Sequence, residues 1–162
     1  MSATTKNETR IEADPNLPTI TITREFDAPR DPVYRAFTDP ELVTQWLGPK
    51  SIEVRIEEWD ARTGGSYRYT AWRDGEEVAA FYGSFHEARE NERIVQTFTY
   101  VGFPDGVSLE TITFTDLGDG RTRVTSLAVV DTMEAREAML ASGMDVGVNE
   151  GYEKLDALLA KS

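Results

Sequence analysis

The sequence contains no cysteine and a single histidine, His86. The lack of cysteine excludes disulfides, thiolate metal ligands and a cysteine nucleophile, and it is compatible with a reducing compartment. A metal site or a serine–histidine triad would have to be built around His86 alone. We therefore expect no metal and no cofactor, and we interpret His86 as a surface residue of a strand.

Long apolar runs and an excess of basic residues are also missing. No apolar stretch reaches the ~18 residues that a membrane-spanning helix needs, and the polar N-terminus lacks the apolar stretch of a secretory signal. We therefore expect a cytoplasmic protein with no membrane insertion. The 29 acidic residues outnumber the 17 lysines and arginines, which gives a formal net charge of −12. This charge repels phosphate backbones, so we expect no nucleic-acid partner.

With 162 residues, 40% of them apolar, the chain is about one domain long and can bury a substantial core. Residues 1–17 show no sustained hydrophobic period, and we interpret them as a flexible N-terminal arm. No repeat or linker is visible after this arm. We therefore predict a single domain over residues 18–162.

The predicted domain contains two kinds of periodicity. Alternating apolar and polar residues predict a strand over 19–26, and Asp-Pro pairs at 31–32 and 39–40 each predict the start of a short helix. Over 52–130, turn residues separate about six strands, whose short connections favour antiparallel pairing. The period then becomes helical up to the C-terminus, and an interruption at 142–143 stays open. This order predicts an α+β fold, in which a curved antiparallel sheet wraps around a long C-terminal helix.

The same residues resemble a known family. The matching segments are Ile22–Leu42, Trp46–Pro49, Arg62–Tyr69, Glu92–Thr97, Leu109–Phe114, Ser142–Gly147 and Tyr152–Leu158. They resemble bacterial domains homologous to the C-terminal domain of the activator of the heat-shock-protein-ninety ATPase, in the START-like (SRPBCC) superfamily. The resemblance implies the helix-grip, or Bet v 1-like, fold of order β-α-α-β(6)-α, with an internal apolar cavity. It does not settle the function, and residues 1–17 are far too short for the separate N-terminal domain of the full cochaperone.

Strand parity predicts the lining of such a cavity, because residues two apart share a face. The strand residues proposed as ligand-binding are Tyr67, Tyr69, Phe98, Tyr100, Ile112 and Phe114, and those near the terminal helix are Met139, Met144 and Val148. The tyrosines combine an apolar body with a hydroxyl, which suits aromatic or polyketide-like ligands. The alternative is that these side chains fill a solid core, as large apolar residues usually do.

Glu110 shares the face of Ile112 and Phe114, where an apolar residue is expected. A buried carboxyl must be paired, hydrogen-bonded or protonated, and burial raises its pKa whereas a nearby arginine lowers it. Glu110 is therefore the candidate for orienting a ligand and for acid–base catalysis. The alternative is a hydrated or arginine-bridged carboxylate at the open end of the strand.

Three functions follow from these residues and stay open. The first is binding of a small hydrophobic molecule, which is aromatic, polyketide-like or lipid-like. The second is an enzyme of the cyclase, aromatase or hydrolase type that uses Glu110. The third is a cochaperone-like interaction module of the stress response, which would contact a chaperone through the sheet or the acidic surface. A homodimer, formed through strand edges or the short helices, is also left open.

Overall fold

One antiparallel sheet and four helices make up the residues that the computed structural model describes, 7–161. In chain order the elements are β1 (Arg10–Ala13), β2 (Thr19–Phe26), α1 (Arg30–Thr38), α2 (Pro40–Trp46), β3 (Glu53–Trp59), β4 (Ser66–Arg73), β5 (Glu76–Arg89), β6 (Arg93–Tyr100), β7 (Ser108–Gly118), β8 (Arg121–Val129), α3 (Met133–Ala141) and α4 (Met144–Ala160). The strand order is β1-β2-β8-β7-β6-β5-β4-β3. All neighbouring strands pair antiparallel.

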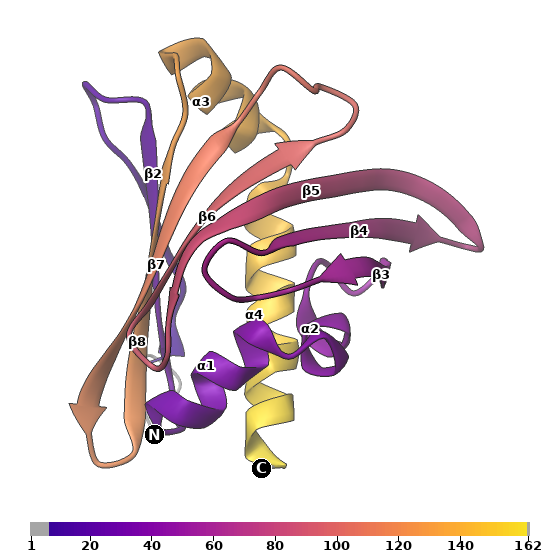
Figure 1. Ribbon diagram of the computed structural model, residues 1–162. Coiled ribbons are helices and arrows are strands. Elements are labelled where there is room, and N and C mark those ends of the chain that lie inside the picture. Colours follow the sequence, from indigo (N-terminus) through magenta and orange to yellow (C-terminus); the bar gives the residue numbers. More distant parts are fainter. Residues whose placement is uncertain (1–6, 162) are drawn as a thin grey trace.

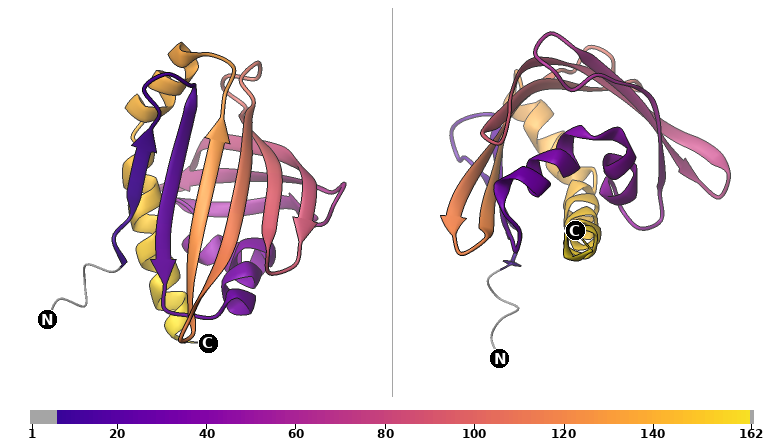
Figure 2. Two further views of the ribbon diagram at one scale, coloured as in Figure 1. Left: turned by 90° about the vertical axis from the view of Figure 1, so that its left-hand side faces the viewer. Right: turned by 60° about the horizontal axis from the view of Figure 1, so that its bottom comes forward.

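The sheet is curved but not closed, and its concave side holds α4. Figure 1 shows α4 running along this side with α1 and α2 beside it, and the right-hand view of Figure 2 shows the sheet arching over these three helices. Register shifts in the β3–β4, β4–β5, β5–β6 and β7–β8 ladders contribute to the curvature, because an extra residue bends a strand. The predicted α+β helix-grip fold is confirmed, with six strands between α2 and α3.

β1 lies within the segment that the sequence analysis interprets as a flexible arm. Arg10–Ala13 pair with β2, from Arg10 opposite Thr23 to Ala13 opposite Ile20. The interpretation therefore has to be corrected for these four residues, which form regular structure at the edge of the sheet. The flexible-arm interpretation of residues 1–6 lies outside the described residues. The single domain over residues 18–162 stays a prediction.

The connection between β1 and β2 is held by an arginine from the other end of the chain. Arg136 of α3 is buried, and its Nη1 donates to the carbonyl oxygens of Asp14, Leu17 and Thr19 at 2.8, 3.0 and 3.1 Å. These contacts supply hydrogen-bond donors to two carbonyl groups of the connection and to that of Thr19, the first residue of β2. Because the partners are more than a hundred residues apart, local periodicity could not indicate the order of this segment.

The two short helices lie beside α4 on the concave side of the sheet. Asp39 caps α2, because its Oδ1 accepts from the backbone N–H of Glu41 at 3.0 Å, and Pro40 occupies the first turn. The indole Nε1 of Trp46 donates to the carbonyl oxygen of Ala36 at 2.8 Å and joins α2 to α1. The helix start predicted at residues 39–40 is confirmed.

The C-terminal helical region is two helices. Gly143 has φ = 87°, a left-handed conformation that favours glycine, and it separates α3 from α4. The interruption left open at Ser142-Gly143 is real, and a short helix precedes the long C-terminal one. Gly151 brings α4 close to the end of α2, since a Cβ there would lie 3.0 Å from the carbonyl oxygen of Trp46. The backbone of α4 consequently contacts α2 more closely than it contacts any strand.

Within residues 7–161, none of the helices has the length and apolar character needed to cross a membrane.

Candidate functional site

A polar pair lies in the middle of the inner face of the sheet. Glu110 of β7 and Gln96 of β6 are opposite each other in the ladder, and Gln96 Nε2 donates to Glu110 Oε1 at 3.0 Å. On the same face Glu110 has small neighbours, namely Ala128 across the β8 ladder and Ser108 two residues before it. Ser108 Oγ is buried and has no hydrogen-bond partner among the described residues.

Glu110 has no basic partner within residues 7–161; its one side-chain hydrogen bond is the one from Gln96. Burial raises the pKa of Glu110 from 4.5 to about 7, because desolvation penalises the charged form, and the Gln96 hydrogen bond lowers it in part. The residue nevertheless keeps some accessible surface. The carboxyl is thus enclosed by protein groups while the residue as a whole is only half-buried. At neutral pH both of its protonation states are populated, so it can donate or accept a hydrogen bond.

Other inner-face residues near Glu110 also keep accessible surface. Those that are half-buried are Ile22, Gln96, Phe98, Ser126, Met144 and Val148. They come from β2, β6, β8 and the N-terminal half of α4.

An aromatic wall extends from this region across three strands. The ring centroid of Phe81 on β5 lies 5.1 Å from that of Tyr69, 5.2 Å from that of Phe98 and 5.6 Å from that of Tyr100. The rings of Phe81 and Phe98 are stacked, with an interplanar angle of 18°. Rings arranged in this way offer flat faces to an aromatic or apolar ligand.

A groove of about 390 Å³ opens onto the surface beside this wall. Its lining residues are Leu47, Gly48, Pro49, Ile52, Val54, Tyr69, Ala71, Arg73, Val78, Ala79 and Phe81. Tyr69 and Phe81 belong to both the groove and the aromatic wall. The groove thus leads from the α2–β3 connection toward the inner face of the sheet.

The three tyrosines near Glu110 differ in what their hydroxyls bind. Tyr67 donates to the carbonyl oxygen of Thr97 at 2.6 Å, whereas the hydroxyls of Tyr69 and Tyr152 have no hydrogen-bond partner within the described residues. Burial, and then the negative charge of Glu110, raise the pKa of both Tyr67 and Tyr69. Burial is also the main cause of the raised pKa of Tyr152, where Arg24 acts in the opposite direction. All three phenols therefore stay protonated near neutral pH.

Gly83 makes the Tyr67 hydrogen bond possible. A Cβ at this position would lie 2.0 Å from the carbonyl oxygen of Thr97 and 2.6 Å from the Tyr67 hydroxyl oxygen. We expect Gly83→Ala to lower the free energy of unfolding by about 2 kcal/mol through overpacking, measured by urea denaturation. Ser84→Ala, on the exposed neighbouring residue, is the control. Equal stability of the two variants would contradict this account of Gly83.

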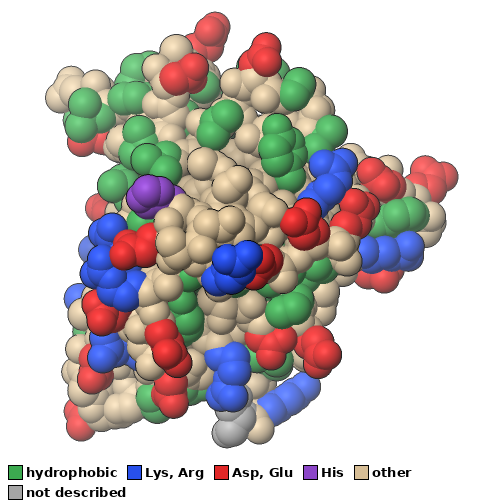
Figure 3. Space-filling model, in the orientation of Figure 1, with side chains coloured by type: hydrophobic (Ala, Val, Ile, Leu, Met, Phe, Trp, Pro, Cys, Tyr) green, Lys and Arg blue, Asp and Glu red, His purple; other side chains and the backbone are tan. Residues whose placement is uncertain are grey.

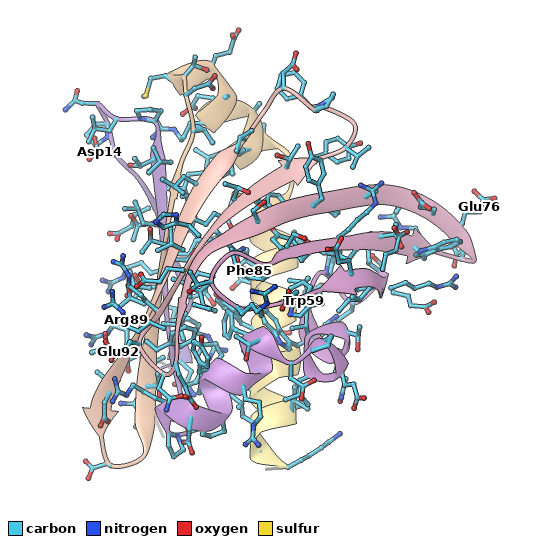
Figure 4. All side chains as sticks on the ribbon, in the orientation of Figure 1. Asp14, Trp59, Glu76, Phe85, Arg89 and Glu92 are labelled. Carbon is cyan, nitrogen blue, oxygen red and sulfur yellow. The ribbon has the colours of Figure 1, made fainter. Side chains whose placement is uncertain are left out.

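The structure separates the predicted site residues into groups. Ile112 and Phe114 are buried in the core, where the Phe114 ring lies 5.2 Å from that of Tyr34 on α1. The Tyr67 ring packs 5.1 Å from Trp59 and 5.2 Å from Phe85; these two partners are labelled near the centre of Figure 4. These three predicted residues take part in packing.

The remaining predicted residues differ in burial, since Tyr69 is also buried in the core whereas Phe98 is half-buried. Tyr69 and Phe98 belong to the aromatic wall, and Tyr100 stands at its exposed end with 45% of its surface accessible. Met144 and Val148 are half-buried on α4, and Met139 is half-buried on α3. The structure thus joins Tyr69, Phe98 and Tyr100 in one aromatic cluster around Phe81.

Sequence reasoning missed Gln96 and the buried Arg24. The alternation of Ile94, Gln96 and Phe98 could have identified Gln96, because it places an amide on the inner face. Arg24 likewise follows the inward period of β2. Its partner Asp156 lies on α4, however, and no spacing along the chain indicates that pairing.

Among the described residues, no group of three or more His, Cys, Asp and Glu side chains is placed to hold a metal ion. His86 is exposed on β5, and Figure 3 shows it on the surface of the molecule.

Comparisons with known proteins agree with this architecture. Residues 27–160 match the model of a family described as activator of Hsp90 ATPase homolog 1-like protein. The chain is similar to a solved structure from Mycobacterium smegmatis, at 29% identity and a TM-score of 0.83 over 94% of this chain and 97% of that chain. A structure from Chromobacterium violaceum is similar at 30% identity, with a TM-score of 0.74 over 87% and 96% of the two chains.

A more distant structure shares the fold alone. It is a protein in the dynemicin biosynthetic locus, similar at 21% identity and a TM-score of 0.66 over 86% of this chain and 47% of that chain. Comparison with curated proteins finds no match.

Proposed function

Because the chain belongs to the family of activator of Hsp90 ATPase homolog 1-like proteins, we propose that it binds a small hydrophobic molecule between the sheet and the N-terminal half of α4. Proteins of this superfamily commonly bind hydrophobic ligands. The observation that carries the proposal is the position of Glu110 and Gln96, a polar pair on a partly accessible inner face beside an aromatic wall. Such a combination of apolar walls and a few polar groups is typical of small-molecule sites.

The proposed ligand has an apolar body and at least one polar group. Its body would lie against Tyr69, Phe81 and Phe98, and its polar group would reach Glu110 or a free tyrosine hydroxyl. The structural neighbour from a biosynthetic locus is in keeping with a small-molecule ligand. The groove lined by Tyr69 and Phe81 would serve as the entrance in this proposal.

The test is saturable binding of a neutral, fluorescent apolar probe, N-phenyl-1-naphthylamine. We expect one probe per chain and an affinity about tenfold lower in Phe98→Ala, because the variant loses a stacking face and apolar contact area. Phe103→Ala is the control, since Phe103 is 62% exposed on the β6–β7 connection. Absence of saturable binding, or equal losses in both variants, would contradict the proposal.

An enzyme acting at the same site is the second candidate. It is favoured by the pKa of about 7 of Glu110, which allows proton transfer near neutral pH, and by the free hydroxyl of Tyr69. If a bound molecule is extracted from the protein purified from its own host and proves to be turned over, Glu110→Gln should abolish turnover. Unchanged turnover in this variant would exclude Glu110 as the acid or base.

Protein interaction is the third candidate, and it is favoured by an apolar patch on the outer face of the sheet. Leu109 and Val129 are exposed opposite each other in the β7–β8 ladder, and exposed Leu127 lies beside them. Figure 3 also shows apolar side chains gathered on the upper part of the molecule, where α3 and the β6–β7 connection lie. Leu127→Lys would weaken a contact through this patch and leave probe binding intact.

A further inference from the structure

The charges on the inner face of the sheet are unbalanced. Arg24 is the buried arginine of this face, and its guanidinium is held by Asp156 through Nη1–Oδ1 and Nη2–Oδ2 contacts of 3.0 and 2.6 Å. Arg24 also donates to the carbonyl oxygen of Glu25. Its charge is therefore matched by Asp156, while Glu110 forms no ion pair with any of the residues 7–161.

The polar side chains described around Glu110 are all neutral. Gln96 contributes a neutral amide from β6, Tyr67 and Tyr69 contribute phenols from β4, and Tyr152 contributes a phenol from α4. The aromatic wall adds ring faces, which attract cations through their negative quadrupole. A carboxylate without a counter-ion beside such rings is a site that a cation completes.

Resting on the proposed function, we propose that the molecule bound between the sheet and α4 is a hydrophobic amine, with a protonated amino group that pairs with Glu110 and an apolar body against Tyr69, Phe81 and Phe98. An ammonium group donates charge-assisted hydrogen bonds to a carboxylate, which are about twice as strong as those of a neutral hydroxyl. A ligand carboxylate or phosphate would face Glu110 with the same sign of charge, inside a protein of net charge −12.

Pairing with an ammonium group also offsets the free-energy cost of desolvating the Glu110 carboxylate. Burial holds the pKa of Glu110 at about 7 in the free protein, and a bound cation favours the ionised form. Amine binding should therefore lower this pKa. Below pH 7, where free Glu110 is mainly protonated, the affinity for a strongly basic amine should fall by roughly tenfold per pH unit.

Three probes with one ring system and different charge test this inference. They are 1-naphthylmethylamine, 1-naphthalenemethanol and 1-naphthoic acid, each titrated at pH 8 by calorimetry and by displacement of N-phenyl-1-naphthylamine. We expect the amine to bind at least tenfold more tightly than the alcohol, and the acid to bind most weakly. Glu110→Gln should remove the difference between amine and alcohol.

The matched control is Glu77→Gln, which removes the same charge from an exposed position on β5. It should keep the full preference for the amine, and circular dichroism should show that both variants are folded. Equal affinity of amine and alcohol, or a preference that survives in Glu110→Gln, would overturn the amine inference; binding of the neutral probe would then leave the proposed function standing. If neither the neutral probe nor any naphthalene binds, the proposed function falls as well.

Discussion

Replacing Asp156 with alanine is expected to lower the free energy of unfolding by about 3 kcal/mol, because it leaves the Arg24 guanidinium buried without a counter-ion. The Arg24 side chain is 5% exposed and that of Asp156 is 37% exposed, with an Nη2–Oδ2 distance of 2.6 Å. Water can reach the freed guanidinium only from the Asp156 side. The expected loss therefore lies at the lower end of the range for breaking buried pairs.

A second ion pair on the same helix serves as the control. Glu153 of α4 pairs with Lys50 at 3.0 Å, and the two side chains are 58% and 60% exposed. Exposed pairs contribute roughly 0–1 kcal/mol, so Glu153→Ala should have a small effect in the same urea denaturation experiment. The double change of Arg24→Met with Asp156→Leu should recover most of the stability, because no charge is then buried. Equal losses in Asp156→Ala and Glu153→Ala would refute the assigned role of the buried pair.

Glu110→Gln is expected to have the opposite sign and to stabilise the fold above neutral pH. The folded-state pKa of about 7 lies above the ordinary value of 4.5, so the unfolded chain releases this proton first as the pH rises. Between these two values the unfolded state binds fewer protons, and stability falls with pH. A shift of this size corresponds to at most about 3 kcal/mol, which Glu110→Gln should regain at pH 8.

The measurement is a series of urea denaturation curves between pH 4 and pH 8. The gain in Glu110→Gln should be largest at pH 8 and should approach zero as the pH falls below 4.5, where the carboxyl becomes protonated in both states. Glu77→Gln, at its exposed position, should show no such trend. A gain that does not depend on pH would mean that the amide packs better, and it would contradict the raised pKa.

Local patterns were sufficient for most elements of this fold. The Asp39-Pro40 pair indicated α2, and the alternation over 19–26 indicated β2, because capping and pleating depend on residues only a few positions apart. The same reasoning missed β1. Its position depends on pairing with β2, and the connection that follows it depends on Arg136, far along the chain.

The site was predicted less completely than the fold. Parity placed Ile112 and Phe114 on the face of Glu110, and the structure agrees. Parity could not, however, distinguish residues that line a binding site from residues that pack in the core. Aromatic side chains of α1 pack against Phe114 and cover that end of β7. The backbone of α4, in contrast, approaches α2 rather than the sheet. One inner face therefore contains both a solid core and accessible residues.

The sequence by itself determined the order of the elements, the antiparallel pairing of the strands and the face on which Glu110 lies, since each of these follows from short-range spacing and turn length. Only the tertiary structure decided what Glu110 meets, namely Gln96 from the next strand, the small side chain of Ala128 and, within residues 7–161, no basic partner. The reason is that burial, pKa and the room beside a side chain depend on distances between elements, and periodicity along one strand does not encode those distances.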